Sequence, residues 1–404
     1  MRLYLHDYGG HAFIVQLARS LARRGHAVRY GYSATNEAPQ GDLAPRADDP
    51  AAFELDPVVT APVDKRARSL AGLVRRRQAE ARFGKQAAEH VRQWDPEVVV
   101  AANASLDVVA PLERAARDRG AAFVNWLQDV HSVGTRAVLE GRFGLPGDLL
   151  GRAFEAREGR LLRRADAVIA ITDAFRPLLQ RWRVDGDRVS VLNNWAPLAD
   201  LPRRPKDNPW ARRHGLEDAR VVLYSGTLGM KHDPAGLADL AERLADLEDA
   251  RLVVVSSGEG ADWLGREQRA RGLEALTLLP FQPFEVFPDV LGSADVTVAV
   301  LEPEASVVSV PSKVLAYLCA GRPTVLSVPA ENLAAQIVTD AGAGVVVPPG
   351  DSGALSQAVL DLLEDGDDRA AMGDAGRTYA ERAFDLEAIA ARFEGVLEAA
   401  LARR

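Results

Sequence analysis

The chain has 404 residues, of which 47% are apolar and 26% charged, and its formal net charge is -8. This composition excludes a disordered chain and a collagen-like repeat, and the length favours two domains over a single hydrophobic core. The negative charge argues against a general nucleic-acid-binding protein.

The single cysteine, Cys319, cannot form an internal disulfide, which fits a reducing cytosol. With no visible signal peptide and no apolar run near the roughly 18 residues of a membrane span, we expect a cytoplasmic protein, with membrane contact only peripheral, at the inner membrane face.

Apolar runs of strand length alternate with amphipathic segments of helix length, and this alternation occurs twice along the chain. The predicted strands of the first half are 2–5, 27–30, 98–102, 122–126, 167–171 and 189–192. Those of the second half are 221–225, 252–256, 276–279, 296–301, 324–328 and 344–347. Such alternation indicates parallel sheets wrapped by helices, so we predict an α/β protein with two Rossmann-like domains.

A proline-rich stretch separates the two halves and cannot continue a helix or a central strand. We therefore predict an N-terminal domain over 1–195, a linker over 196–210 and a C-terminal domain over 211–380. The last segment, 381–404, is rich in Ala, Glu and Arg with helical periodicity, and we expect its helix to cross back to the first domain.

The first predicted strand is followed by Gly9, Gly10 and His11, which open a helix. A glycine turn at a helix N-terminus lets a ligand approach the backbone closely, although an ordinary tight turn has the same signature. Ligands of open α/β sheets bind beyond the carboxyl ends of the strands, so this turn is a candidate binding element.

The first strand of the second half leads into a similar turn that contains Gly226, Thr227 and Lys231. A lysine beside a helix start suits a diphosphate, although Lys231 also fits a solvated surface residue. The turn is not a P-loop, because His232 and Asp233 follow the lysine instead of Ser or Thr.

A third helix start carries a lysine after Pro311 and Ser312. A cation next to the positive end of a helix dipole is unfavourable unless an anion joins it, so Lys313 indicates a bound phosphate or carboxylate, with a solvated lysine as the alternative.

Taken in order, short motifs across nearly the whole chain resemble the family-4 (group 1) glycosyltransferases of the GT-B fold, in particular the branch that builds bacterial surface polysaccharides. The motifs are Gly9-Gly10 with Gly25-His26-Ala27-Val28, Leu192-Asn193-Asn194-Trp195, Ser225-Gly226-Thr227-Leu228-Gly229, Ser293-Ala294-Asp295-Val296, Pro311-Ser312-Lys313-Val314, Ala320-Gly321-Arg322-Pro323 and 344–351. The resemblance implies two domains facing across a cleft, a nucleotide-sugar donor bound by the second, a hydroxyl acceptor bound by the first at Gly9, Gly10 and His11, and transfer with retention. It implies no cofactor and no metal ion, and the Asp-x-Asp sequences at 185–187 and 365–367 lie in predicted turns.

The resemblance also assigns residues. Thr227 and Lys231 fall where the family places its diphosphate-binding pair, with Thr227 in place of a common arginine. The two glutamates that the family often has are replaced by Val308 and Ala316, so we expect Lys313, with Ser312, to take over part of the anion binding.

Two further loops complete the predicted site. Phe281 and Gln282 occupy the loop that resembles the family's base-binding clamp, although Phe281 is equally consistent with a core residue. The loop after the strand 122–126 carries Asp129 and His131, near the family's His-Asp position, and we expect at least one of them to touch substrate.

Two other functions are compatible with the sequence. A sugar-nucleotide epimerase uses a similar architecture but needs no acceptor, and the missing glutamates are consistent with a non-catalytic sugar-nucleotide-binding partner subunit. A basic helix with Arg66, Arg68, Arg75, Arg76, Arg77 and Arg82 fits either a solvated surface or contact with anionic lipid near a lipid-linked acceptor.

Overall fold

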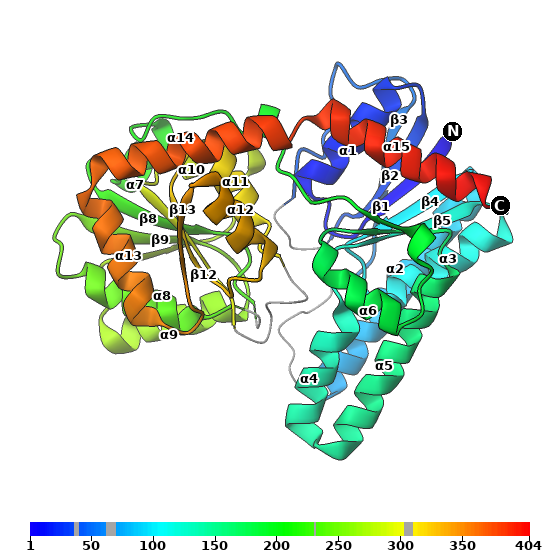
Figure 1. Ribbon diagram of the computed structural model, residues 1–404, viewed down its shortest axis with the longest axis horizontal. Helices are drawn as coiled ribbons and strands as arrows, with labels where there is room; N and C mark the ends of the chain where they lie inside the picture. Colours follow the sequence, from blue (N-terminus) through cyan, green and yellow to red (C-terminus); the bar gives the residue numbers. More distant parts are fainter. Residues whose placement is uncertain (36–39, 62–69, 230–231, 303–309) are drawn as a thin grey trace. The chain divides into compact units, whose positions relative to one another are not determined.

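The chain folds into two compact units (Figure 1). The computed structural model describes residues 1–35, 40–61, 70–229, 232–302 and 310–404. Unit 1 contains Met1–Asn194 and Leu386–Arg404, and unit 2 contains Trp195–Asp385. The boundary thus falls one residue before the predicted linker, and the chain returns to unit 1 after Asp385.

Unit 1 is built on a seven-stranded parallel sheet with the order β3-β2-β1-β4-β5-β6-β7. Its strands are β1 (Arg2–Asp7), β2 (Ala27–Ser33), β3 (Phe53–Val58), β4 (Val98–Ala102), β5 (Ala122–Leu127), β6 (Ala167–Ala170) and β7 (Val189–Val191). The sequence analysis missed β3, which lies at the sheet edge and contains Glu54, Asp56 and Pro57. Polar residues and proline are tolerated on an edge strand, so the apolar pattern that reveals central strands is absent there.

The helices of unit 1 cover both faces of this sheet. They are α1 (Ala12–Arg23), α2 (Leu70–Trp94), α3 (Leu106–Asp118), α4 (His131–Phe143), α5 (Leu145–Arg164), α6 (Arg176–Arg181) and α15 (Leu386–Ala402), with short 3-10 turns at Asp173–Phe175 and Gly186–Arg188. α15 packs against α1, β5 and β6, where the ring of Phe393 lies 4.9 Å from that of Trp126. The last helix of the chain is therefore part of the core of unit 1.

Unit 2 has a six-stranded parallel sheet with the order β10-β9-β8-β11-β12-β13. The strands are β8 (Arg220–Ser225), β9 (Ala250–Val255), β10 (Leu276–Leu279), β11 (Val296–Val300), β12 (Thr324–Ser327) and β13 (Gly344–Val347). The helices are α7 (Pro209–His214), α8 (Pro234–Leu244), α9 (Glu259–Arg271), α10 (Phe287–Gly292), α11 (Lys313–Ala320), α12 (Leu333–Ala341), α13 (Ser352–Glu364) and α14 (Gly366–Ala383), with 3-10 turns at Leu198–Asp200 and Phe284–Val286.

The prediction of two Rossmann-like parallel-sheet domains is confirmed. In each sheet the first strand of the unit lies in the interior, and the strand order changes direction beside it. Loops at the carboxyl ends of these central strands are the places where open α/β sheets bind ligands. Among the residues that the structure describes, none of the helices has the length and apolar character required to cross a membrane.

Candidate functional site

The loop after β1 is organised by a buried carboxylate, Asp7. Its side chain is fully buried and accepts hydrogen bonds from the backbone N–H groups of Gly9 (3.1 Å) and His11 (2.5 Å) and from the Tyr30 hydroxyl (2.8 Å). Nδ1 of the His11 ring lies 2.9 Å from the same carboxylate. The ring folds back over the turn, so a Cβ atom at Gly9 would lie only 2.0 Å from Cε1 of His11. The glycine is needed for this close approach.

The Asp7 carboxylate occupies two backbone N–H groups of the first turn. They belong to Gly9 and His11, directly before α1, so these two amides are already bound within the protein. Burial alone would raise the pKa of Asp7, but the charge and hydrogen bonds of His11, with the Tyr30 hydroxyl, lower it below its ordinary value. An ionised Asp7 thus holds the His11 ring at the carboxyl end of β1.

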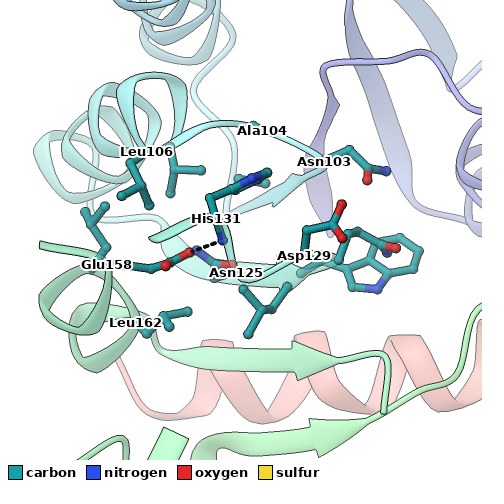
Figure 2. A pocket seen from close by; sticks show the side chains of 14 residues that line it. Asn103, Ala104, Leu106, Asn125, Asp129, His131, Glu158 and Leu162 are labelled. Carbon is teal, nitrogen blue, oxygen red and sulfur yellow. Dashed lines mark hydrogen bonds between the residues drawn. The ribbon is translucent and has the colours of Figure 1, made fainter. Parts of the chain in front are cut away.

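The loops after β4 and β5 extend this polar edge of the sheet. Asn103, whose φ is +46°, follows β4 and places its amide nitrogen 3.4 Å from Nδ1 of His11. Asn103, Asp129 and His131 line one cavity of about 20 Å³, which has room for a water molecule but not for a sugar. Figure 2 shows Asn103 and Asp129 at one end of this cavity and Leu162 at the other.

Glu158 fixes the start of α4 beside this cavity. Its carboxylate accepts hydrogen bonds from the backbone N–H groups of His131 (3.3 Å) and Ser132 (2.9 Å), the first of which is drawn in Figure 2. The amides of Gln128 and Asn194 pair reciprocally at 3.1 and 2.6 Å. The structure therefore brings the predicted residues His11, Asp129 and His131 to one edge of the unit 1 sheet.

In unit 2 the central feature is Lys313, the first residue of α11. Its ammonium group donates to the Tyr224 hydroxyl and to the Thr227 carbonyl (3.3 Å), and it lies 3.8 Å from the centroid of the Tyr224 ring. The Tyr224 hydroxyl in turn donates to the Thr227 carbonyl at 2.9 Å. Burial raises the pKa of Tyr224 well above its ordinary value, so the phenol stays protonated. Lys313 is thereby held at the carboxyl end of β8.

Gly226 makes room for this lysine. Its φ is +136°, and a Cβ atom there would lie 2.8 Å from Cε of Lys313. Any other residue would strain the backbone and push the lysine stem away. The predicted residues Gly226, Thr227 and Lys313 therefore form one cluster in unit 2.

The start of α8 differs from the expectation that it offers free amides to a phosphate. The side chain of Asp233 caps the helix and accepts hydrogen bonds from the N–H groups of Ala235 (3.0 Å) and Gly236 (3.1 Å). Nδ1 of His232 accepts a hydrogen bond from the N–H of Gly229 at 2.9 Å and shapes the loop before the cap. In the described part of the cluster formed by Gly226, Thr227 and Lys313, positive charge therefore comes from the Lys313 side chain and not from the amides at the start of α8.

The remaining predicted residues occupy separate places. The Gln282 carbonyl oxygen accepts from the Trp210 indole (3.1 Å), its amide nitrogen donates to the Pro280 carbonyl (2.9 Å), and Phe281 is half-buried. Ser312 is exposed and precedes α11. Lys231 lies outside the described residues, as do Val308, Arg66 and Arg68.

No group of three or more His, Cys, Asp or Glu side chains suited to a metal ion occurs within the described part of the chain. The two Asp-x-Asp sequences have structural roles there. Asp185 accepts from the N–H of Asp187, and Asp365 accepts from the N–H groups of Asp367 and Asp368 at the start of α14.

Four residues of these clusters, Asp7, Asn103, Glu158 and Tyr224, were missed by the sequence reasoning. Asp7 and Asn103 had a usable signal, because each is a polar residue at the carboxyl end of a buried strand. Tyr224 and Glu158 had none, since each acts through a residue far away in the sequence.

Two family models match the chain, one for each unit. The model described as "Glycosyl transferase 4-like domain" matches residues 9–195, and the model described as "Glycosyl transferases group 1" matches residues 219–365. The chain is a group 1 glycosyltransferase of the GT-B fold. The matched ranges include both clusters described above.

Individual relatives agree with this family. WcaI of Escherichia coli, named for a glycosyl transferase role in colanic acid biosynthesis, is 26% identical over 75% of this glycosyltransferase and 74% of WcaI. The crystal structure of Anabaena HepE in complex with UDP and glucose has a TM-score of 0.70 at 16% identity, over 98% of this chain and 99% of HepE. Sucrose-phosphate synthase of Thermosynechococcus elongatus has a TM-score of 0.73 at 16% identity over 100% of both chains. Because the sequence identity to HepE and to this synthase is low, these two structural similarities show the fold alone.

Proposed function

We propose that this glycosyltransferase moves a sugar from a nucleoside diphosphate donor to a hydroxyl acceptor, with retention and without a metal ion or other cofactor, in polysaccharide or glycoconjugate biosynthesis. The similarity to WcaI supports a role in a polysaccharide, and the UDP and glucose bound to HepE make UDP-sugars the first donors to test. The family matches are to transferases and do not favour an epimerase or a non-catalytic subunit.

The observation that carries the proposal is the ammonium group of Lys313 at the carboxyl end of β8. Breaking the bond between an anomeric carbon and a diphosphate develops negative charge on the leaving group, and a fixed cation lowers that barrier. Tyr224 and the Thr227 carbonyl hold Lys313 in place, which reduces the reorganisation required during the reaction. Lys231, on the loop after β8, is proposed as the second cation.

The acceptor is proposed to bind unit 1 at the loops after β1 and β5. Gly9, Gly10 and His11 would meet the acceptor, with Asp129 or His131 aligning a sugar hydroxyl. The Asp7 carboxylate fixes the His11 ring, which suits a side chain that must orient a substrate. We further propose that the acceptor is carried on a lipid, so that the reaction takes place in the cytoplasm at the inner membrane face.

The test is a thermal-shift screen of the protein with UDP, GDP, ADP, dTDP and CDP, followed by transfer assays with the matching nucleotide sugars. A ligand that binds the native state raises its stability. Lys313→Ala and Lys231→Ala should each lose the nucleotide shift and lower turnover on the order of 10² to 10³-fold. Lys85→Ala, which removes an exposed lysine of α2 in unit 1, is the matched control and should keep both.

A different experimental result would contradict each part of the proposal. If Lys313→Ala keeps the shift and the turnover, the lysine is not the diphosphate ligand. Donor conversion without any acceptor would favour the epimerase, and nucleotide binding without transfer or hydrolysis would favour the binding subunit. Loss of activity in EDTA would contradict the metal-independent reaction, and an inverted product, seen by NMR, would contradict retention.

A further inference from the structure

The helical hairpin of α4 and α5 projects from unit 1 (Figure 1). It carries exposed aliphatic side chains towards its end. Leu145 is 81% exposed, Leu149 67%, Leu150 51% and Val138 51%. We call these four side chains the apolar tip. Large aliphatic side chains at such exposure are ordinary when they are scattered singly, but a group of them on one projecting element marks an interaction surface.

The packing inside the hairpin explains why the leucines face outward. Helix α5 turns glycines toward α4, where a Cβ atom on Gly147 would lie 1.9 Å from the Leu139 carbonyl oxygen and one on Gly151 would lie 2.4 Å from Cγ of Arg136. The two helices therefore approach closely through small residues. The side chains of the apolar tip do not form the contact between α4 and α5. The packing of the hairpin therefore does not require apolar residues at these positions.

Most carboxylates of the hairpin face inward. Asp148 and Glu155 have side chains that are only 11% and 14% exposed, and both pair with Arg136, at 2.7 and 3.2 Å. Glu140 is an exposed acidic residue of α4. Negative charge at the surface beside the apolar tip is therefore low.

The exposed charges beside the tip are mainly guanidinium groups. The side chain of Arg152, one turn after Leu149, is 63% exposed although its Nε pairs with the Asp148 carboxylate at 2.8 Å. On α2, Arg75, Arg76 and Arg77 are all exposed, although Arg76 pairs with Glu80 and Arg77 with Asp107. The guanidinium of Arg77 also lies 4.6 Å from the ring centroid of Phe154 on α5. This contact places the basic part of α2 against the same helix that carries three of the tip's four side chains.

We propose that the apolar tip inserts into the interface of an anionic lipid bilayer while the neighbouring arginines contact its phosphate groups. An apolar group flanked by basic residues is the pattern of a protein that lies on a membrane without crossing it. Arginine stems lie along the apolar boundary and place their charges at the level of the headgroups. The inference rests on the proposed function in one respect, because a lipid-linked acceptor would be presented at that surface.

The test is co-sedimentation of the full chain with vesicles of phosphatidylglycerol and phosphatidylcholine at a 3:7 ratio. Each inserted leucine strengthens partitioning by on the order of tenfold, so the double substitution L145S/L149S should weaken binding about a hundredfold. Val59→Ser is the matched control, since Val59 is 67% exposed in unit 1 but belongs to a different segment, and it should bind as the unchanged protein does. Pure phosphatidylcholine vesicles or 0.5 M salt should release most of the protein.

Two vesicle results would overturn the proposal: no binding of the unchanged protein at low salt, or equal binding of L145S/L149S and the unchanged protein. A dimer seen in light scattering that L145S/L149S dissociates would also overturn it, because the apolar tip would then bind a second copy of this chain instead of a membrane. A nucleotide thermal shift on the same samples separates the two proposals. A normal shift with no vesicle binding rejects the membrane surface alone, whereas binding to vesicles without any shift rejects the donor site alone.

Discussion

Replacing Asp7 with asparagine should destabilise unit 1 strongly. Each carboxylate oxygen of Asp7 accepts two hydrogen bonds, Oδ1 from the Gly9 N–H and the His11 ring, and Oδ2 from the His11 N–H and the Tyr30 hydroxyl. An asparagine presents one oxygen, one NH₂ group and no charge, so one backbone N–H group loses its acceptor whichever way it turns, and the remaining bonds are no longer made to a charged group. A hydrogen bond to a charged group contributes about 1.5–3 kcal/mol, so Asp7→Asn should cost about 3–6 kcal/mol.

Hydrogen exchange measured by mass spectrometry is the suitable assay, because it reports the two units separately. Peptides from β1, α1 and β2 should lose protection in Asp7→Asn, while peptides from β8 and β9 serve as an internal control. Tyr30→Phe removes a single bond and should cost about half as much. If Asp7→Asn costs no more than Tyr30→Phe, the Asp7 carboxylate does not hold the β1 loop together.

The lowered pKa of Asp7 also predicts that the free energy of unfolding falls at acid pH. The pKa of Asp7 is lowered in the folded protein from an ordinary value of 3.8, so its contribution is complete above that value and is lost as the pH falls through the lower folded pKa. Between these two pKa values the unfolded chain binds the proton first, which favours unfolding. Asp7→Asn should lack this contribution, and its loss of stability relative to the unchanged protein should shrink as the pH falls below 3.8.

Three further predictions follow from packing. Gly226→Ala should displace the stem of Lys313, because the new Cβ atom would lie 2.8 Å from Cε of the lysine. The Kd for nucleotide, measured by calorimetry, should rise at least tenfold while the far-UV circular dichroism spectrum stays unchanged. An unchanged Kd would contradict this prediction. Phe393→Ala removes a fully buried ring from beside Trp126 and should cost about 3–5 kcal/mol in urea unfolding; a cost below about 1 kcal/mol would mean that α15 does not belong to the core. Cys319 is buried, which raises its thiol pKa to about 12, so a thiol reagent at pH 8 should react only after urea is added, and fast labelling of the folded protein would refute this.

The parallel sheets were predictable because central strands are buried on both faces and form continuous apolar runs, such as those of β4 and β11. The edge strand β3 was not, since its polar residues carry no such signal. The lysine of the unit 2 cluster was found from its place at a helix start. Its partner Tyr224 was not, because the pair depends on how β8 lies beside β11 and how α11 packs on them, which no short motif encodes.

The networks built on Asp7 and Glu158 show a related limit. A helix start in the sequence predicts free amides, but a carboxylate can bind backbone N–H groups there, as Asp7 does in the turn just before α1 and Glu158 does at α4. Asp7 is four residues from His11, yet Tyr30 reaches it from the neighbouring strand. The sequence located the loops that carry the candidate site but not the internal partners that fix their side chains.

The return of the chain to unit 1 has a consequence for synthesis. Unit 2, 195–385, is one continuous segment whose synthesis is complete before α15 is made, whereas unit 1 must wait for 386–404. Until then the faces of Trp126 and α1 that α15 covers are exposed to water. Unit 2 therefore needs no later segment of the chain to complete its fold, whereas unit 1 depends on the last helix. A chain truncated after residue 385 and released from the ribosome would carry every residue of unit 2 but an N-terminal unit without α15.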